Sequence, residues 1–356
     1  MSIKKFDYTV ASVLAALNEI TRGRVVMDWE EVTAGRNPYV VMKTSNIPGK
    51  SVMEIPGLIF GSKDKPVRKI GVGMTLTESM IELASGIGLD LVIVHHPVAD
   101  AANSGGVPLA GYLPLYNIAL MELHEAFHGL HPGVAYLHGH RKLSTDINFC
   151  GVPGNILHVG VALDGIRTAG DMIRHLDRFM GREQERKLLE AERRIRGDIQ
   201  MIETTLSNPN QILSGTPDSP VKHILHFFPH TGFSVHDLER ALEMHPETDT
   251  IIASISRVRE DHPLVQVARQ RRLTFIVGNP HSVEILENGV PLAYAIQQIL
   301  PGLEVFILRE RVTASLLSQL GHKEIAEYGR EMALGYLVPE GKEAKAGRGK
   351  TVTVVN

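Results

Sequence analysis

The sequence predicts an α/β protein made of two α/β lobes with mostly parallel sheets. A strand–helix–strand rhythm runs through residues 67–94, and a similar rhythm returns over residues 223–308. Residues 91–94 are a continuous run of Leu, Val, Ile and Val, which is typical of a strand covered on both faces. The chain has 356 residues, of which 43% are hydrophobic, and this is enough for more than one packed core.

Local signals justify the elements in order. Residues 8–20 have helical spacing, and the first helix after a strand ends at Gly86 and Gly88, which are typical helix-ending residues. A strand, a helix and a second strand in succession imply a parallel pair with a right-handed crossover. The predicted strands are 67–72, 89–94, 223–228, 250–255, 273–277 and 304–308, and the predicted helices are 77–85, 235–243, 263–271 and 291–299.

Between the lobes, opposite charges recur at helical spacing over residues 182–196. This pattern favours a solvated helix, with contacts in an oligomer as the alternative. Residues 207–220 are rich in Ser, Pro, Asn and Gly and are expected to form a loop. We expect a first lobe at 1–145, a connecting region with the charged helix at 146–220, a second lobe at 221–310, and a C-terminal extension at 311–356 whose tail is mobile from about 340.

Composition excludes several classes of protein. The net charge of −3 argues against a dedicated nucleic-acid-binding protein. Cys150 is the single cysteine, so neither an intramolecular disulfide nor a cysteine cage for zinc is possible. No apolar stretch reaches transmembrane length, and the first residues lack the apolar core of a signal peptide. We therefore expect a soluble, cytoplasmic protein with no membrane contact.

The run 89–97 ends a buried strand in His95, His96 and Pro97. In open α/β sheets, ligands bind at the carboxyl ends of the strands, where these imidazoles could hold a metal. Neighbouring side chains at a strand end point in different directions, so the pair suits two metals, or two sides of one cluster, better than one ion. The alternative is a polar pair that begins a loop.

Two further places supply ligand types beyond predicted strands. His281 follows the strand at 273–277, and Glu284 stands three residues later, on the same face if a helix starts there. A histidine and a carboxylate on one face suit zinc, iron or manganese. The segment 117–128 adds His124 and His128, four residues apart.

Residues 124–128 also match the pattern His-Glu-x-x-His of zinc proteases, in which Glu125 would be the general base. Gly129 and Pro132 would end such a helix early, and no third histidine follows at the expected place. We favour a strand over 118–123 with both histidines in the segment beyond it. Plain surface histidines are the second interpretation, and the protease is the third.

Together these motifs resemble those of the NGG-interacting-factor-three-like family, whose members are often called GTP cyclohydrolase I type 2 homologues. The strand ending in His-His-Pro matches fully, with its lead-in at 55–61 and 69–72. The second motif aligns over 117–128, but His128 replaces the family's Asp. In the third, Glu284 follows His281 by three residues rather than four. The resemblance covers residues 8–145 and 220–310.

The resemblance implies two interlinked lobes around a dinuclear metal centre, and a homohexamer. It implies two divalent transition metal ions per chain, either zinc, iron, nickel or manganese. His124 would lie nearby as a further ligand or as a support for one. The implied metal ligands are His95, His96, His128, His281 and Glu284.

Paired metals held by histidine and carboxylate suit hydrolysis. The expected function is a metal-dependent hydrolase that acts on a nucleotide or a related small molecule, as the cyclohydrolase label implies. Glu284 and His124 are the candidate catalytic residues, and Glu122 is another candidate acid or base. The alternative is a non-enzymatic, metal-bearing oligomeric scaffold that binds a partner, because fold and site do not fix a reaction.

Overall fold

The structure is a computed structural model that describes residues 7–44, 49, 51–98, 109–255 and 257–338. It divides into two compact units. The first comprises residues up to 182 together with 208–311 and contains a five-stranded and a six-stranded sheet, besides two two-stranded pairs among the described residues. The second comprises 183–207 and the residues from 312 onward. The predicted α/β class is confirmed, and each unit is described by itself below.

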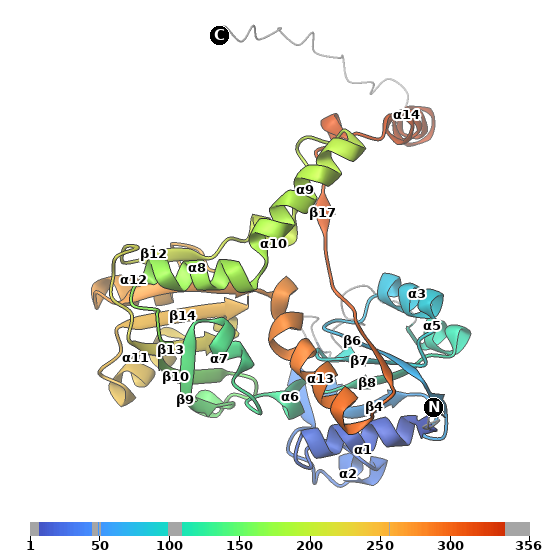
Figure 1. Cartoon of the computed structure of the whole chain (residues 1–356), viewed down its shortest axis with the longest axis horizontal. Coiled ribbons are helices and arrows are strands. Elements are labelled where there is room, and N and C mark those ends of the chain that lie inside the picture. The colour runs from blue at the N-terminus through green and yellow to red at the C-terminus, as the bar shows by residue number, and fades with distance from the viewer. Residues whose placement is uncertain (1–6, 45–48, 50, 99–108, 256, 339–356) are drawn as a thin grey trace, which may run out of the picture. The chain divides into compact units, whose positions relative to one another are not determined.

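The first sheet has five strands in the order β16-β6-β7-β8-β4 (Figure 1). The four strands β16, β6, β7 and β8 are parallel, and β4 runs antiparallel to β8 at the edge. The strands are β4 (Gly57–Phe60), β6 (Lys69–Gly73), β7 (Leu91–Val94), β8 (Ala119–Glu122) and β16 (Glu304–Ile307). The helices around them are α1 (Val10–Ile20), α3 (Glu78–Ile87), α5 (Leu109–Tyr116) and α13 (Val290–Ile299).

Strand β7 is buried on both faces, as its apolar run predicts. Leu91 and Ile93 belong to the hydrophobic cluster that contains α1 and α13 residues. Val92 and Val94 belong to the cluster that contains α3 and α5 residues. This alternation follows from the two-residue period of a strand, and it fixes the strand that precedes His95 between two layers of helices.

Helix α3, between β6 and β7, runs two residues further than predicted, because Gly86 lies inside it and only Gly88 ends it. The Thr77 hydroxyl accepts a hydrogen bond from the Met80 amide and caps the N-terminus. Gly88 ends the helix in the left-handed conformation, with φ of 73°. These caps set the length of the crossover, and so the position of β7 and of the two histidines after it.

The second sheet has six strands in the order β12-β15-β14-β13-β10-β9. Its centre, β13 to β15, is parallel, and β9, β10 and β12 are antiparallel to their neighbours. Helix α8 packs on one face, and α11 and α12 pack on the other. The strands are β9 (His140–Asp146), β10 (Ile156–Ala162), β12 (Gln211–Ser214), β13 (His223–Phe228), β14 (Thr250–Ile255) and β15 (Thr274–Pro280). The helices are α8 (Ala169–Phe179), α11 (Val235–Met244) and α12 (Pro263–Gln270).

The strand order adds three details to the predicted organisation. Strand β16, expected at the end of the second rhythm, pairs with β6 and therefore belongs to the first sheet. The segment 146–220, expected as a connection, supplies β10, α8 and β12. The expectation of a loop throughout 207–220 is wrong at β12, which pairs with β15 because Leu213 is buried there. The expected domain bounds stay a prediction.

The second unit contains the charged helix α9 (Arg182–Arg196), which forms where the charge pattern predicts it. Ion pairs join Arg186 to Glu183 and Arg196 to Glu192 along its surface. The other elements are β11 (Ile202–Glu203), α10 (Thr204–Ser207), β17 (Thr313–Ala314), α14 (Lys323–Met332) and a π-helical turn (Ala333–Leu337). The tail predicted to be mobile lies outside the described residues.

The remaining elements are short. They are β1 (Tyr8–Thr9), α2 (Trp29–Thr33), β2 (Val41–Thr44), β3 (Ser51–Glu54), β5 (Pro66–Val67), α6 (His124–Phe127), α7 (Gly133–Leu137), the 3₁₀ turns Phe149–Gly151, His230–Gly232, His281–Val283 and Leu317–Gln319, and the π turn Ile285–Gly289. Among the residues that the structure describes, no helix has the length and apolarity needed to cross a membrane.

Candidate metal centre

The site begins where β7 ends. The backbone amides of His95 and His96 donate hydrogen bonds to Gly73 and Met74, which extends the ladder with β6 beyond the strand. Both histidines are buried, and their rings are tilted by 53° with centroids 5.4 Å apart. Because the backbone is held on one side by β6, the two imidazoles have fixed and different directions, as expected for neighbours at a strand end.

Glu284 joins this pair from the second sheet. It follows β15 after the 3₁₀ turn His281–Val283 and is only 1% exposed. Its Oε1 lies 3.4 Å from His95 Nε2, and its Oε2 lies 3.0 Å from His96 Nε2. Burial opposes ionisation of this carboxyl, but His96 and His95 outweigh it and hold the pKa of Glu284 well below its ordinary value. The strand ends of both sheets therefore contribute to one cluster within the first unit.

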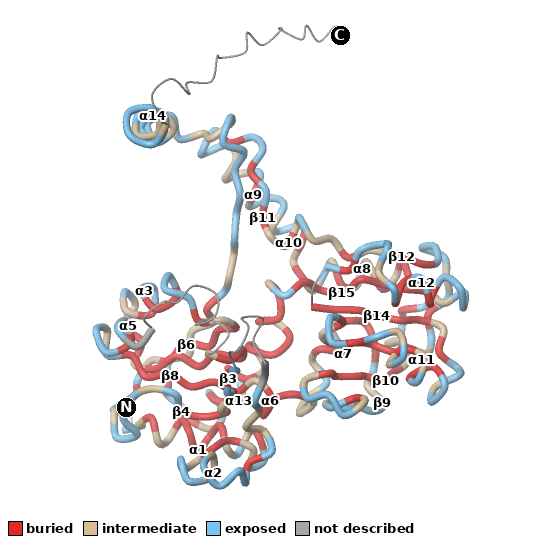
Figure 2. The backbone as a smooth tube through the Cα atoms, turned by 180° about the vertical axis from the view of Figure 1, so that it is seen from behind, coloured by how far each residue is buried: buried red, intermediate tan, exposed pale blue. Residues whose placement is uncertain are grey.

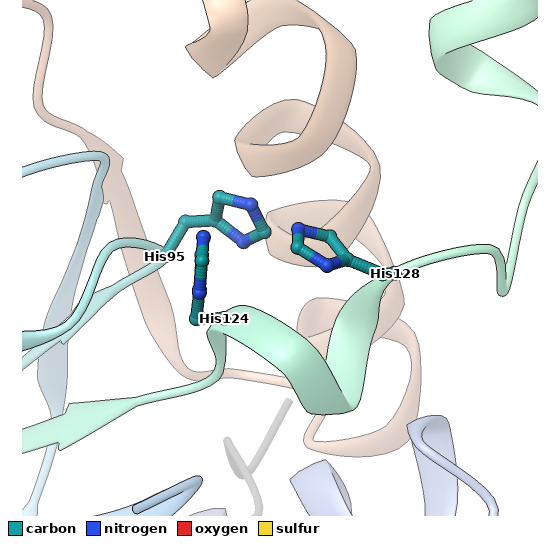
Figure 3. Close-up of side chains that lie close together, drawn as sticks. All are labelled: His95, His124 and His128. Atoms are coloured by element: carbon teal, nitrogen blue, oxygen red, sulfur yellow. The ribbon is translucent and has the colours of Figure 1, made fainter. Parts of the chain in front are cut away.

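A single helical turn supplies two more imidazoles. Strand β8 ends at Glu122, and α6 follows with His124 at its start and His128 just beyond its end. Their ring centroids lie 4.7 Å apart, and each lies 5.3 Å from the ring of His95. Figure 3 shows the three rings gathered around one small space. The favoured interpretation of a strand followed by two histidines is confirmed, with a helical turn in place of an irregular loop.

Two groups of ligand atoms share His95. One comprises His95, His96 and Glu284, and the other comprises His95, His124 and His128. Within each group, one ligand atom per residue lies within 4.8 Å of the others. Both groups combine imidazoles with at most one carboxylate, which are donors suited to zinc, iron or nickel.

His95 gives the test of whether a metal fits. Its side chain is 3% exposed, and within the described residues neither ring nitrogen has a hydrogen-bond partner. Burial lowers the pKa of His95 to about 4, although Glu284 acts in the opposite direction, so the ring is neutral at pH 7. A neutral, buried imidazole without hydrogen bonds is costly in a protein interior, and metal coordination would remove that cost. The residues present therefore fit a metal ion.

Two buried glutamates orient the outer rings. Glu54 Oε2 lies 2.9 Å from His124 Nδ1, and Glu125 Oε2 lies 3.2 Å from His128 Nδ1. In each case a carboxylate that accepts from Nδ1–H leaves Nε2 as the ligand atom, the usual arrangement around protein-bound metals. Glu54 was not among the predicted site residues. It shares the buried face of β3 with Val52, but its contact with His124 comes from tertiary structure and has no local signal in the sequence.

Glu125 does not occupy the place of a protease general base. It is 4% exposed, and its two oxygens face His124 and His128 rather than a water-filled space. Helix α6 is one turn long and ends at Gly129, which has a positive φ of 73°. The zinc-protease pattern therefore lies on a turn whose glutamate supports the histidines.

Two predicted residues have a different setting from the rest. His281 is half-exposed, stacks on His96 with centroids 4.3 Å apart, and places Nε2 3.3 Å from Glu284 Oε2. It belongs to neither compact ligand group, so its role as a ligand stays a prediction. Glu122 accepts hydrogen bonds from the amides of Ile55 and Val98, and thereby joins two loops. That role is structural.

A cavity of about 600 Å³ opens above the cluster. The cluster forms one wall, and residues at or near the ends of strands of the second sheet form the other. The lining residues are Thr75, His96, His124, His128, Pro153, Gly154, Asn155, Phe228, Pro229, Thr231, Gly232, Ile255, His281 and Glu284.

Fold and site thus define an α/β protein of two linked sheets with a buried His/Glu cluster compatible with metal binding. Residues 40–102 match the sequence model of a family described as Duf34/NIF3 (NGG1p interacting factor 3). This match, which includes His95, His96 and Pro97, confirms the predicted resemblance to the NGG-interacting-factor-three-like proteins. A search of curated proteins found no match.

Solved structures share the fold. A Bacillus cereus protein related to NIF3 is 9% identical, with a TM-score of 0.53 over 86% of this chain and 98% of its own. The protein ybgI, described as of unknown function, is 15% identical, with a TM-score of 0.51 over 84% and 97%. The Staphylococcus aureus hypothetical protein SA1388 is 12% identical, with a TM-score of 0.51 over 85% and 97%.

Proposed function

We propose that the cluster binds divalent transition metal, one or two ions per chain, and that the protein is a metal-dependent hydrolase of a small molecule. The observation that carries this proposal is His95, a buried imidazole that two groups of ligand atoms share. Neither of its ring nitrogens has a hydrogen-bond partner among the described residues, although Nε2 lies 3.4 Å from Glu284 Oε1. One ion would be held by His95, His96 and Glu284, and a second by His124 and His128, with His281 at the open side.

A bound ion supplies Lewis acidity, which polarises a carbonyl or phosphoryl oxygen and makes water a better nucleophile. The protein contributes positioning and proton transfer. Glu54 holds His124 through Nδ1, so that Nε2 faces the cluster. In this proposal His281, which is half-exposed and lies 3.3 Å from Glu284 Oε2, would pass a proton between the cavity and solvent.

The lining of the cavity bears on the substrate. Phe228, Pro229 and Ile255 offer apolar surface, and Asn155 and Thr231 offer hydrogen-bonding groups. None of the described lining residues is a lysine or an arginine. Triphosphates are usually held by such cations, so this wall favours a nucleobase, a nucleoside or a similarly uncharged molecule over a nucleoside triphosphate. The purine-type substrate remains the one that the family resemblance implies.

The test begins with elemental analysis of the purified protein. The double variant His95→Ala/His96→Ala should lose its metal, while His236→Ala, which changes an exposed histidine on α11, should keep it. Hydrolysis should then be screened with uncharged nucleosides and with nucleoside triphosphates, with and without chelator. Chelator-sensitive turnover of the uncharged set supports the proposal. Full metal content in the double variant would overturn the site, and metal without turnover would favour the non-enzymatic scaffold.

A further inference from the structure

The second unit exposes many large apolar side chains among its described residues. Helix α14 and the π turn after it contain no buried residue, as the absence of red in Figure 2 shows. Exposed large hydrophobic residues of this unit are Leu188, Ile195, Ile199, Ile202, Val312, Leu316, Leu317, Ile325, Tyr328, Leu334, Tyr336 and Leu337. An amphipathic helix that buries nothing gains no stability from packing, so a partner for its apolar face is expected.

The apolar face of α14 is a narrow stripe. Ile325, Tyr328 and Met332 follow one another at spacings of three and four residues, which places them on one side of the helix. Ile325 is 53% exposed and Tyr328 is 60% exposed. Glu324 and Glu331 each precede a stripe residue, and both therefore lie on the same flank of the stripe. The stripe of α14 thus has one acidic flank.

Helix α9 carries a matching stripe with the opposite charge. Leu188 and Ile195, seven residues apart, are 53% and 82% exposed. Lys187 and Arg194 each precede one of them, and both are exposed. The apolar spacing of seven residues and the flank spacing of seven residues are the same as in α14. The two helices therefore present the same pattern, with a basic flank on α9 and an acidic flank on α14.

Only an antiparallel pairing brings these flanks together. When two helices pack face to face in opposite directions, the flank that precedes each stripe residue lies on the same side of both helices. Lys187 and Arg194 would then face Glu331 and Glu324. In a parallel pair, the same flanks lie on opposite sides. Charge complementarity therefore selects α9 as the partner of α14 and an antiparallel direction for the pair.

Within one chain, the two stripes do not cover each other, because Leu188, Ile195, Ile325 and Tyr328 are all more than half exposed. Gly321 packs so closely on the end of α9 that an added Cβ would lie 1.9 Å from the carbonyl oxygen of Arg196. The next residue, His322, caps α14 by accepting a hydrogen bond from the Ile325 amide. Helix α14 therefore starts beside the C-terminal end of α9, yet its stripe does not lie on that helix. Because both stripes stay exposed within one chain, a second copy is the partner that can cover both of them.

We propose that α14 of one copy docks antiparallel on α9 of a second copy, and that the exchange is reciprocal. Each copy offers one α9 stripe and one α14 stripe, so two contacts related by a two-fold axis close the dimer without leaving either stripe exposed. This contact is independent of the metal centre and of the proposed hydrolase activity.

Cross-linking between copies tests the proposal. In a Cys150→Ser background, protein with Leu188→Cys is mixed with protein with Met332→Cys, and a short bismaleimide is added. The expected product is a covalent dimer that contains one copy of each variant. Arg330→Cys, on the opposite face of α14, replaces Met332→Cys in the matched control and should give much less of it. All changed positions of the second unit lie outside a buried core, so folding is not at stake.

Charge reversal supplies the second arm. Two charge-reversed proteins are made, Lys187→Glu/Arg194→Glu and Glu324→Lys/Glu331→Lys. Neither should form the cross-linked dimer on its own, because its two flanks carry the same charge. A mixture of the two should regain it, because each basic flank again meets an acidic one. A link formed within one chain when both cysteines are present would overturn the exchange. Equal yield with the Arg330→Cys control, or no effect of charge reversal, would overturn the stripe-on-stripe contact.

Discussion

At the scale of single residues, His95 decides what the cluster can do. It stands between Glu284 on one side and the rings of His124 and His128 on the other. Its neighbours already have hydrogen-bond partners from carboxylates, whereas its own ring nitrogens have none among the described residues. His95, which both ligand groups share, is therefore the ring whose nitrogens a metal ion would satisfy.

Glu125 gives a direct test of the two roles that the sequence pattern allows. Glu125→Gln keeps an oxygen that accepts from His128 Nδ1–H, so metal content and any hydrolase activity should stay within about tenfold of the native protein. Glu125→Ala removes that oxygen and should weaken metal binding by about 10–100-fold. Metal titration and turnover measure both. A loss of several orders of magnitude in rate for Glu125→Gln, with metal retained, would instead indicate a general base.

At the scale of elements, the length of α6 sets the spacing of two candidate ligands. Gly129 ends the turn with φ of 73°, and a Cβ there would lie 2.9 Å from Ile147 Cγ2. Gly129→Ala should therefore cost about 1–2 kcal/mol of unfolding free energy and displace His128. Gly86 offers a matched control. It lies within α3 with nothing near its missing Cβ, so Gly86→Ala should stabilise the protein by about 0.5–1 kcal/mol.

Urea unfolding and metal titration of both variants check this prediction. Destabilisation by Gly86→Ala, or unchanged stability in Gly129→Ala, would show that the backbone angle at Gly129 does not control the turn. Loss of stability without loss of metal affinity would separate the fold of α6 from the placement of His128.

Elements could be predicted from the sequence where a single local signal dominates. The apolar run of β7 and Gly88 after α3 are signals of this kind. Strand β7 lies within its predicted range, and α3 ends at Gly88, although Gly86, which was also expected to end it, lies inside the helix. Strand β12 was missed because only Ile212 and Leu213 are apolar in a polar segment, and its pairing with β15 comes from tertiary contact. The candidate ligands at strand ends could also be predicted, because each follows a predicted strand directly. Glu54 could not, because its contact with His124 joins residues 70 positions apart in the chain.

At the scale of the whole molecule, a second set of buried histidines lies in and against the second sheet. His138, His140, His158 and His226 are buried, and His226 bonds both His140 Nε2 and the Ser254 hydroxyl. Burial, reinforced by neighbouring positive groups, lowers the pKa of His158 to about 3. Burial likewise lowers the pKa of His138 to about 4 and those of His140 and His226 well below the ordinary value. These rings fold as neutral groups.

Stability should therefore fall as the pH decreases below 6.5. An unfolded histidine takes up a proton near pH 6.5, whereas the folded rings remain neutral until about pH 4 or below, so acid favours the unfolded chain. Each ring can contribute up to about 1.4 kcal/mol per pH unit in this window. Glu287, whose pKa burial raises to about 8, acts in the opposite direction, but it is one group against four.

Urea unfolding at several pH values between 7 and 5 measures this slope. His158→Gln should flatten it, because one of the groups that cannot be protonated in the folded state is gone. His236→Gln, at an exposed position on α11, should leave it unchanged. A stability that does not depend on pH below 6.5 would mean that these rings are hydrated or protonated in the folded protein.

Metal should couple the two sheets, because its candidate ligands come from the ends of β7 and β15 and from the turn after β8. Ligands distant in sequence are joined only in the folded chain, so bound metal stabilises that state by mass action. Chelator should lower the Tm of the native protein and leave the Tm of His95→Ala/His96→Ala unchanged, since that variant has no metal to lose. Calorimetry with metal content determined in parallel measures this. If metal is removed and the Tm stays the same, the ion is adventitious, and the buried His95 must be satisfied in another way.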